Sequence, residues 1–384
     1  MKFITAQRLQ DIEPFQVMSV LARAHALEAQ GRSIVHMEIG EPDFPIARPI
    51  AEAAIAAIDA GHTRYLPALG LPALRGRIAC SYPTPVRPDP ERVVITPGAS
   101  GALQLVLAAL LSPGDEVLLA DPGYPCNRHF VRLFEGKAVT IAVDGATQYQ
   151  LTAELIREHW TAQTVAVLIS SPSNPTGTVV PEAEMARIIE TVDALGGRVI
   201  VDEIYGRLCY DAAPTTVLQQ SQEAFVINSF SKYYGMTGWR VGWLVAPQEY
   251  ISAIDKLAQN IFIATSSPAQ YAALAAFEPV VEHELQQRVR LFKERRDFLL
   301  PALRGLGFEI AVTPPGAFYL YADCSALTHD SQAFALDVLE RAGVAITPGR
   351  DFGRNRPEQH VRFSYANTLE RLEEGVRRLA EYLR

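Results

Sequence analysis

A single lysine, Lys232, stands in a short segment that also carries two serines, Ser229 and Ser231, and an arginine, Arg240. Apolar residues typical of strands precede and follow this segment. Hydroxyl groups and a guanidinium suit a phosphate, because together they offer several charge-assisted hydrogen bonds. An amine held beside a phosphate suits covalent attachment of an aldehyde cofactor. A Ser-x-Lys pattern alone more often describes a solvated lysine in a turn, so the rest of the chain decides between the two interpretations.

Length and composition exclude several classes of protein. A chain of 384 residues with 48% hydrophobic content supports two domains, or one large α/β domain with an appendage. The net charge of -8 argues against general affinity for nucleic acid or an anionic membrane. Four scattered cysteines without a C-x-x-C pair argue against a metal site or disulfide framework and predict a cytoplasmic location. Residues 1–8 lack the apolar core of a signal peptide, and no apolar run reaches the ~18 residues of a membrane span.

Strands and helices alternate through the middle of the chain. Strands are expected over 93–96, 116–119, 137–143, 165–169, 198–202 and 224–227, with helices over 102–111, 153–158 and 181–194. This alternation predicts a mostly parallel sheet with helices on both faces. Ligands in such folds bind at the carboxyl ends of the strands. Polar residues occupy those ends in this sequence, at Thr96, Asp121, 170–177, Asp202 and 229–232.

Two of the loops after strands could contact an anion or a planar ring. The turn containing Ala99, Ser100 and Gly101 leads from a strand into a helix, which presents backbone N–H groups to an anion. Small residues also fill ordinary strand-to-helix turns, so the turn alone does not decide. Tyr124 follows the next strand in a rigid loop, where its ring could stack on a planar cofactor or anchor the loop.

Three further polar residues each allow a functional and a structural interpretation. Asn174 can donate an amide hydrogen to an oxygen, or Asn-Pro can simply form a turn. Asp202 ends a fully apolar strand, where it could pair with a protonated pyridine nitrogen or cap a helix. Arg362 alternates with Val361 and Phe363, so it is expected to point inward. An inward arginine either forms an ion pair between domains or binds a carboxylate.

The regions outside this sheet predict further helices and a smaller α+β domain. Helices are expected over 15–30, 49–60, 71–79, 248–257, 268–277, 281–303, 331–342 and 369–383. Strands are expected over 34–39, 308–312, 317–321, 344–347 and 359–365, and four prolines exclude a helix from 82–90. The division predicted is an N-terminal arm with part of the small domain over 1–45, a large domain over 46–280 and a C-terminal small domain over 281–384.

Together these motifs resemble the class I/II family of pyridoxal-phosphate aminotransferases, the fold-type-I group. The resemblance covers nearly the whole chain in the same order: Asn-Pro-Thr-Gly at 174–177, Asp-Glu-x-Tyr at 202–205, Ser-x-Ser-Lys at 229–232, Gly-x-Arg-x-Gly at 238–242 and an x-Arg-x-Ser strand at 361–364. It implies an α/β large domain with a mostly parallel seven-stranded sheet, and a smaller α+β domain built from both termini.

The resemblance also implies a role for each matching residue. Lys232 looks like the lysine that carries pyridoxal 5'-phosphate as a Schiff base and later moves the substrate's Cα proton. Asp202 looks like the partner of the pyridine nitrogen, Tyr205 and Asn174 like donors to the phenolic oxygen, and Tyr124 like the stacking aromatic. The implied phosphate site comprises Ala99, Ser100, Gly101, Ser229, Ser231 and Arg240, with Tyr65 reaching the phosphate of a neighbouring subunit. The implied receptor for the substrate carboxylate comprises Gly40, Asn174 and Arg362.

The activity implied is ping-pong transfer of an amino group from an L-amino acid to a 2-oxo acid, by a homodimer that shares its active sites. No nucleic acid, membrane or metal is expected as a partner. Ser100 lies where some aspartate-preferring relatives place a lysine, and no second arginine for a dicarboxylate is obvious, which lowers an aspartate preference. Ile12 and Phe15 are expected to line the substrate entrance. The proline-rich stretch 82–90 replaces a helix that family members usually continue.

Two competing functions share parts of this pattern. A C-S β-lyase would use the same Lys232, Asp202 and Arg362, and would differ in releasing pyruvate and ammonia without an amine acceptor. An aminotransferase-like regulatory domain would need a DNA-binding helix-turn-helix ahead of it. The enzyme-like region begins within about the first dozen residues and the net charge is negative, which disfavours the regulatory domain.

Overall fold

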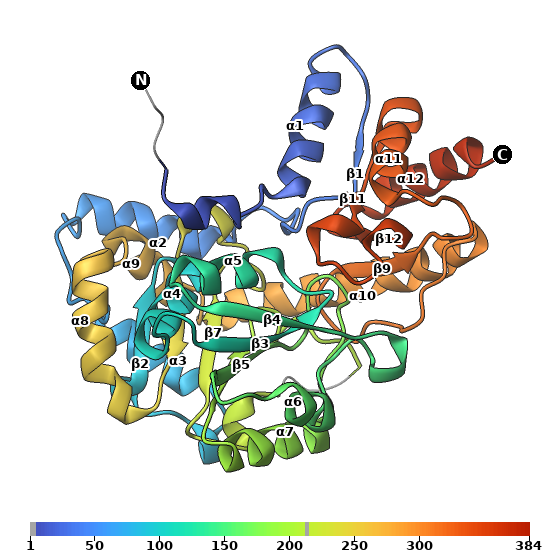
Figure 1. The fold of residues 1–384 in the computed structure, drawn as a ribbon. Helices are drawn as coiled ribbons and strands as arrows, with labels where there is room; N and C mark the ends of the chain where they lie inside the picture. The colour runs from blue at the N-terminus through green and yellow to red at the C-terminus, as the bar shows by residue number, and fades with distance from the viewer. Residues whose placement is uncertain (1–4, 212–214) are drawn as a thin grey trace.

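The computed structural model describes residues 5–211 and 215–384. Seven strands form a central sheet in the order β2-β8-β7-β6-β5-β3-β4 (Figure 1). All neighbours pair in parallel except β8, which is antiparallel to both β2 and β7. The strands are β2 Val93–Thr96, β3 Glu116–Asp121, β4 Lys137–Ala142, β5 Thr164–Ser170, β6 Arg198–Asp202, β7 Phe225–Ser229 and β8 Gly242–Val245. The mostly parallel sheet predicted from the alternation is therefore confirmed.

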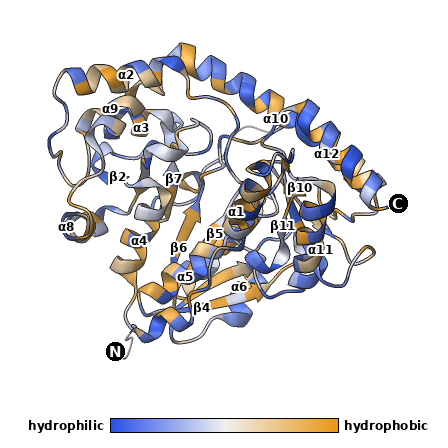
Figure 2. Cartoon of the chain, turned by 90° about the horizontal axis from the view of Figure 1, so that it is seen from above, coloured by the Kyte–Doolittle hydropathy of each residue, from blue (hydrophilic) through white to orange (hydrophobic). Residues whose placement is uncertain are grey.

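Helices cover both faces of this sheet, because successive side chains of a strand point to opposite sides. Val94 belongs to a core with α4, α5 and α8, whereas Val93 and Ile95 belong to a core with α3, α6, α7 and α9. Figure 2 shows the central strands as mostly hydrophobic. The helices are α2 Arg48–Asp59, α3 Pro72–Ser81, α4 Gly98–Leu110, α5 Pro125–Leu133, α6 Ala153–His159, α7 Glu182–Ala194, α8 Ile251–Ile261 and α9 Ser267–Ala275.

A second, smaller unit combines segments from both ends of the chain. Its three-stranded antiparallel sheet has the order β11-β12-β9, and β1 pairs in parallel with β10. Helix α1 stands beside β1 and the C-terminal helices (Figure 1). The elements are α1 Gln16–Glu28, β1 Val35–His36, β9 Tyr319–Asp323, α11 Ser331–Asp337, β10 Val344–Ala345, β11 Thr347–Pro348, β12 His360–Ser364 and α12 Leu369–Tyr382. The boundaries 1–45, 46–280 and 281–384 remain a proposal, and the first four residues lie outside the described part.

The long helix α10, Pro279–Gly305, ties the N-terminal loop to the C-terminal unit. Figure 2 shows it as largely hydrophilic. Its buried Arg295 pairs with Asp43, at 2.7 Å between Nη1 and Oδ1 and 2.9 Å between Nη2 and Oδ2. Arg296 donates from Nη1 to the carbonyl oxygen of Pro314, at 2.9 Å. In the described residues no helix combines the length and apolar character needed to cross a bilayer.

Four expectations for local structure were wrong in extent. The strand over 308–312 is reduced to an isolated bridge at Glu309, although Phe308 and Ile310 are buried. The alternation of apolar residues that predicted a strand here therefore reflects the burial of their side chains and not pairing with a neighbouring strand. The strand over 34–39 is only β1, because β10 offers it two partner residues. The stretch 82–90 contains a 3-10 turn, Thr84–Val86, which tolerates proline because its first N–H groups need no partner. The helix over 331–342 is α-helical only to Asp337 and continues as the π-helix Val338–Ala342.

Candidate active site

The carboxyl ends of β5, β6 and β7 open into a cavity of about 260 Å³. Most of the residues predicted for the site line it: Gly40, Ala99, Ser100, Tyr124, Asn174, Asp202, Tyr205, Ser231, Lys232, Arg240 and Arg362. Three predicted residues, Gly101, Ser229 and Tyr65, are not among its lining residues. The cavity receives side chains from the seven-stranded sheet, from α4 and from the small unit.

Lys232 lies in the loop between β7 and β8 and points into this cavity. Its Nζ donates a hydrogen bond to the carbonyl oxygen of Gly40. The pKa of Lys232 is lowered from 10.5 to about 8, mainly by burial and also by the charges of Arg362 and Arg240, against the opposing charge of Glu41. At pH 7 about a tenth of an amine with this pKa is neutral, far more than for an exposed lysine, so it can act as a nucleophile or base.

Asp202 lies at the end of β6 and has a free face toward the cavity. Its Oδ1 accepts a hydrogen bond from the backbone N–H of Ile204, at 3.0 Å, in a turn that does not begin a helix. The helix-cap interpretation is therefore wrong. In the described residues no basic side chain lies within 4.0 Å of this carboxylate. Burial raises the pKa of Asp202 to about 6. A cation bound in the cavity would stabilise the ionised carboxylate, which has no cationic partner in the described residues.

Two tyrosines meet beside this carboxylate. The hydroxyl groups of Tyr205 and Tyr319 share a hydrogen bond of 2.7 Å, and both side chains are buried. Burial raises the pKa of Tyr205 well above its ordinary value, so the phenol stays neutral and can donate a hydrogen bond. Sequence reasoning did not identify Tyr319, because an aromatic residue in an apolar strand has the pattern of a core residue.

Arg362 projects from β12 and is 3% exposed. Its Nη1 donates to Oδ1 of Asn174 at 2.8 Å, and its Nη2 donates to the backbone oxygen of Glu38 and to Oγ1 of Thr347. Its Nε has no partner in the described residues, and no carboxylate there lies within 4.0 Å of the guanidinium. The ring of Tyr319 lies 4.3 Å below the guanidinium. A buried cation without an anion is costly, so this side chain is arranged for an anionic ligand and not for an ion pair between domains.

The other end of the cavity has the features of an anion site. Helix α4 starts at Gly98, with φ +69°, and Ala99 and Ser100 follow in its first turn. Arg240 approaches so closely that a Cβ on Gly98 would lie 3.0 Å from the Arg240 Cζ and closer still to Nη2. Nη1 of Arg240 donates to the carbonyl oxygen of Thr237 at 3.0 Å, and Ser231 stands next to it. Helix N–H groups, a hydroxyl and a guanidinium therefore converge.

Ser229 and Gly101 support this anion site from behind. The Ser229 hydroxyl accepts a hydrogen bond from the backbone N–H of Ser231 at 3.1 Å and lies 2.9 Å from its Oγ, which fixes the orientation of Ser231. A Cβ on Gly101 would lie 2.7 Å from Cδ of Pro97, so a larger residue would push the start of α4 away. These two residues pack under the site and do not face its interior.

These groups match pyridoxal phosphate, the cofactor that the resemblance implies. The anion site accepts a phosphate, Lys232 supplies an amine, and Asp202 supplies a carboxylate without a cationic partner. The Tyr124 ring forms a wall of the cavity between them. Because each polar group of the cofactor finds a complementary group here, the residues fit pyridoxal phosphate.

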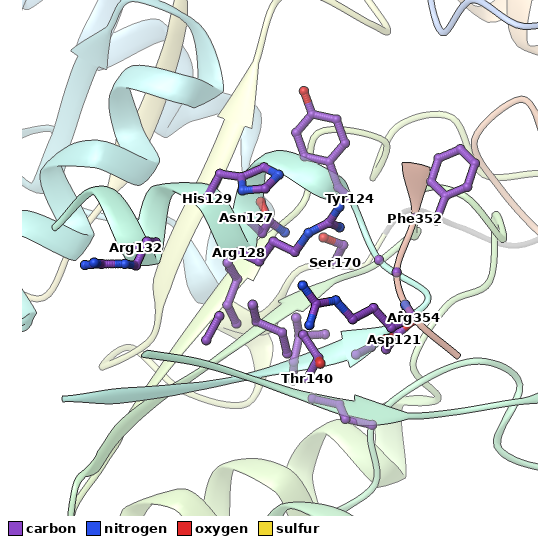
Figure 3. Close-up of a pocket in the computed structure, with 18 of the residues that line it drawn as sticks. Asp121, Tyr124, Asn127, Arg128, His129, Arg132, Thr140, Ser170, Phe352 and Arg354 are labelled. Atoms are coloured by element: carbon purple, nitrogen blue, oxygen red, sulfur yellow. Dashed lines mark hydrogen bonds between the residues drawn. The ribbon is translucent and has the colours of Figure 1, made fainter. Parts of the chain in front are cut away.

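A larger cavity of about 470 Å³ also has Tyr124 among its lining residues (Figure 3). Tyr124 and Asn127 border both cavities, and Figure 3 shows Arg128, Arg132 and Arg354 around the larger one. Its arginines are engaged by acidic side chains: Nε of Arg132 lies 2.7 Å from Oδ2 of Asp11. Neither Lys232, Asp202 nor Arg362 lines it. The larger cavity therefore lacks the three charged groups that the smaller one brings together.

The cavity lined by Lys232 is apolar on the side near α1. Phe15, Val17, Met18 and Ile39 line it. The expectation for Phe15 is confirmed, whereas Ile12 is not among the lining residues of either cavity. Sequence patterning assigns Val17 and Met18 only to a helix, so it could not show that they face a ligand.

Three comparisons show what this chain is similar to. The family model "Aminotransferase class I and II" matches residues 32–379. A valine–pyruvate aminotransferase of Mycobacterium tuberculosis is 39% identical, with 97% of each chain covered. An aspartate aminotransferase of Geobacillus stearothermophilus is 34% identical, with 98% of each chain covered. The crystal structure of an aminotransferase from Mycobacterium tuberculosis superposes with a TM-score of 0.96 at 38% identity, over 100% of this chain and 99% of the other.

Proposed function

Because this chain belongs to the class I and II aminotransferases, we propose that the cavity around Lys232 is its active site and that Arg362 binds the substrate α-carboxylate. The chain is a pyridoxal-phosphate-dependent enzyme that transfers the α-amino group of an L-amino acid to a 2-oxo acid in ping-pong order. The assignment of individual roles rests above all on the buried, anion-free guanidinium of Arg362.

The residues around the cofactor site divide the chemical work. Pyridoxal phosphate, when bound, supplies the electron sink for negative charge at the substrate Cα. Ser231, Arg240 and the N–H groups of α4 would hold the phosphate, and Lys232 would supply the amine for covalent attachment of the cofactor. The released amine of Lys232, with its lowered pKa, then takes the proton from Cα. Asp202 would offer its buried carboxylate to the ring nitrogen of the cofactor and so favour the protonated ring.

Arg362 and its neighbours orient the substrate. The Nε–H of Arg362, which has no partner in the described residues, can donate a charge-assisted hydrogen bond to a substrate carboxylate. Asn174 holds one side of this fork through its Oδ1, which leaves its amide N–H groups free to donate toward the cavity. Tyr205 stays neutral and would donate a hydrogen bond to the phenolic oxygen of the cofactor. The substrate is thereby fixed with its Cα near the amine of Lys232.

The proposed amino donors have neutral, apolar side chains. Phe15, Val17, Met18 and Ile39 supply apolar surface where the side chain of a substrate enters. In the described residues the only guanidinium groups that line this cavity belong to Arg240 and Arg362, and both already have a proposed task. Among the described residues that line this cavity no further guanidinium is left for a second carboxylate, which favours a donor such as valine over aspartate.

The active enzyme is proposed to be a homodimer in a cytoplasmic location. Tyr65 is 83% exposed, and α2 presents Ile55 and Ile58 at 60% and 54% exposure nearby in sequence. Exposed apolar residues of this kind favour an interface between copies, in which Tyr65 would reach the partner's phosphate site. The four cysteines are all free, as is typical of a reducing compartment. Light scattering should give twice the chain mass of 42.2 kDa.

An amino-acid panel combined with an arginine variant tests these roles. Single amino acids are added to the holoenzyme without an oxo acid, and the loss of the visible cofactor band is timed. In Arg362→Gln, kcat/KM for valine should fall by roughly 30- to 4,000-fold, because losing one partner of a buried charge pair costs about 2–5 kcal/mol. Arg341→Gln, at an exposed position on the same unit, is the control.

The panel separates the proposals from one another. A loss of less than about threefold in Arg362→Gln, with the cofactor bound, would remove Arg362 from the carboxylate site. A faster reaction with aspartate than with valine would contradict the apolar substrate class and leave the assignment of Arg362 intact. Retained turnover in Lys232→Ala would contradict the placement of the active site itself.

A further inference from the structure

Two histidines and a glutamate meet on the small unit, outside both cavities. His25 and Glu28 occupy the last turns of α1, and His36 lies in β1. Nδ1 of His25 is 2.9 Å from Oε2 of Glu28, and Nε2 of His36 is 3.1 Å from Oε1 of the same carboxylate. One nitrogen or oxygen atom from each residue lies within 4.8 Å of the others. The three side chains thus form a compact set of ligand types that favour a transition metal.

We propose that His25, Glu28 and His36 bind a divalent transition-metal ion, with zinc as the best match. Zinc takes imidazole nitrogens and carboxylate oxygens at about 2.0–2.2 Å in tetrahedral geometry, which separates neighbouring ligand atoms by roughly 3.3 Å. The separations of 2.9 and 3.1 Å, which run to different oxygens of Glu28, differ from that value by a few tenths of an ångström, and the three ligand atoms as a set lie within 4.8 Å of one another. The His25 side chain is 63% exposed, so water can reach the fourth position.

The buried side chain of Glu38 supplies a second, independent observation. Its Oε1 lies 2.8 Å from Nδ1 of His36, Glu38 is 0% exposed, and its Oε2 has no hydrogen-bond partner in the described residues. When this carboxylate accepts a hydrogen bond from Nδ1–H of His36, the proton stays on Nδ1. The lone pair of Nε2 is then free to face the cluster. Metal-binding histidines commonly have this arrangement, in which a carboxylate behind the ring orients it and increases its basicity.

A proton could occupy the same place as the ion. An imidazolium at His36 would bridge Glu28 and Glu38 by two hydrogen bonds and would also satisfy the buried carboxylate. That arrangement gives His25 no necessary part, because His25 contacts only the other oxygen of Glu28 within this cluster. The contribution of His25 to metal affinity therefore distinguishes the two.

The site would fasten two elements that also serve the catalytic cavity. Helix α1 carries Val17 and Met18 into that cavity at its other end. The backbone oxygen of Glu38 accepts a hydrogen bond from Arg362, two residues after the His36 ligand. An ion that joins the end of α1 to β1 would hold both contributions in place. Scattered cysteines gave no hint of this site, because its histidines come together only when α1 packs against β1.

Calorimetric titration of the tag-free holoenzyme with zinc chloride tests the proposal. One equivalent should bind, His25→Ala should lose at least tenfold in affinity, and Glu38→Gln should lose about 10- to 100-fold. His283→Ala is the matched control, since His283 is an exposed histidine whose hydrogen bond is to Gln287 on the same helix. Cobalt(II) in place of zinc should give weak d–d absorption without a thiolate charge-transfer band, which excludes the cysteines as ligands.

Exposed His25 can be replaced without endangering the fold, and His25→Ala should keep its turnover in the absence of zinc. Glu28→Gln provides a second variant at a surface position, should Glu38→Gln fail to fold. If the calorimetric titration detects no zinc binding at zinc concentrations on the order of 100 micromolar, the proposal is overturned. Equal zinc affinity in the wild type, His25→Ala and Glu28→Gln would overturn it as well, because the ion would then lie elsewhere.

Discussion

Gly98→Ala should lower the affinity for the cofactor by disturbing the phosphate site, without changing any residue proposed to contact the substrate. Gly98 begins α4 with φ +69°, a conformation that glycine adopts freely and alanine does not. A Cβ at this position would lie 3.0 Å from Cζ of Arg240 and 3.3 Å from its Nη1. The guanidinium must therefore move outward, away from the N–H groups with which it would share the phosphate.

Two costs follow from this substitution, and they act on different observables. The left-handed backbone at alanine costs roughly 1–2 kcal/mol of stability. Displacing Arg240 removes a charged hydrogen bond to the phosphate, worth about 1.5–3 kcal/mol. At 1.36 kcal/mol per factor of ten, that loss weakens cofactor affinity by roughly 10- to 150-fold.

Equilibrium dialysis of pyridoxal phosphate measures the affinity, and urea unfolding of the apo protein measures the stability. Gly196→Ala is the matched control, because Gly196 has φ +76° and nothing within 4 Å of its missing Cβ. It should lose similar stability and keep its cofactor affinity. Gly238→Ala, in the same loop as Arg240 and also without a neighbour, should change neither. Unchanged cofactor affinity in a folded Gly98→Ala would refute the role given to Arg240.

Two further predictions concern charge. The rate at which the apo protein takes up pyridoxal phosphate should rise with pH, with a midpoint near 8, because only the neutral amine of Lys232 attacks an aldehyde. A midpoint above about 10 would contradict the lowered pKa of this buried amine. Asp43→Asn should lower the free energy of unfolding by roughly 3 kcal/mol, because it leaves the buried Arg295 unpaired. Glu52→Gln breaks the exposed pair with Arg48 and should cost under about 0.5 kcal/mol in the same urea titration.

The large sheet could be predicted because its strands are apolar runs separated by clear turn residues. Burial on both faces makes 93–96 and 198–202 almost uniformly apolar, and the Gly-rich turn after 96 marks the start of α4. Asp202 was found for the same reason, since a charged residue at the end of such a run is conspicuous, whereas Lys232 was found through the serines and the arginine of its segment. Their meeting in one cavity then follows from the parallel arrangement of the strands.

The rest of the site depends on contacts between distant segments, which leave no local pattern. Tyr319 lies in the cavity because β9 pairs with β12, and its alternation with apolar neighbours resembles that of any core strand. Helix α5 was not predicted, because it is short and its residues mix cationic and aromatic side chains over 125–133. The strand expected over 308–312 was wrong because buried side chains there are not accompanied by a hydrogen-bonded partner strand.

The pairing of β1 with β10 has a consequence for the order in which the protein becomes competent during synthesis. Every strand of the seven-stranded sheet has been synthesised once Val245 has been added, and this part carries Asp202, Lys232 and Arg240. The partner of β1, which begins at Val344, is synthesised roughly a hundred residues later, and Arg362 follows later still. A growing chain therefore acquires the residues for the cofactor well before it can hold the carboxylate of a substrate.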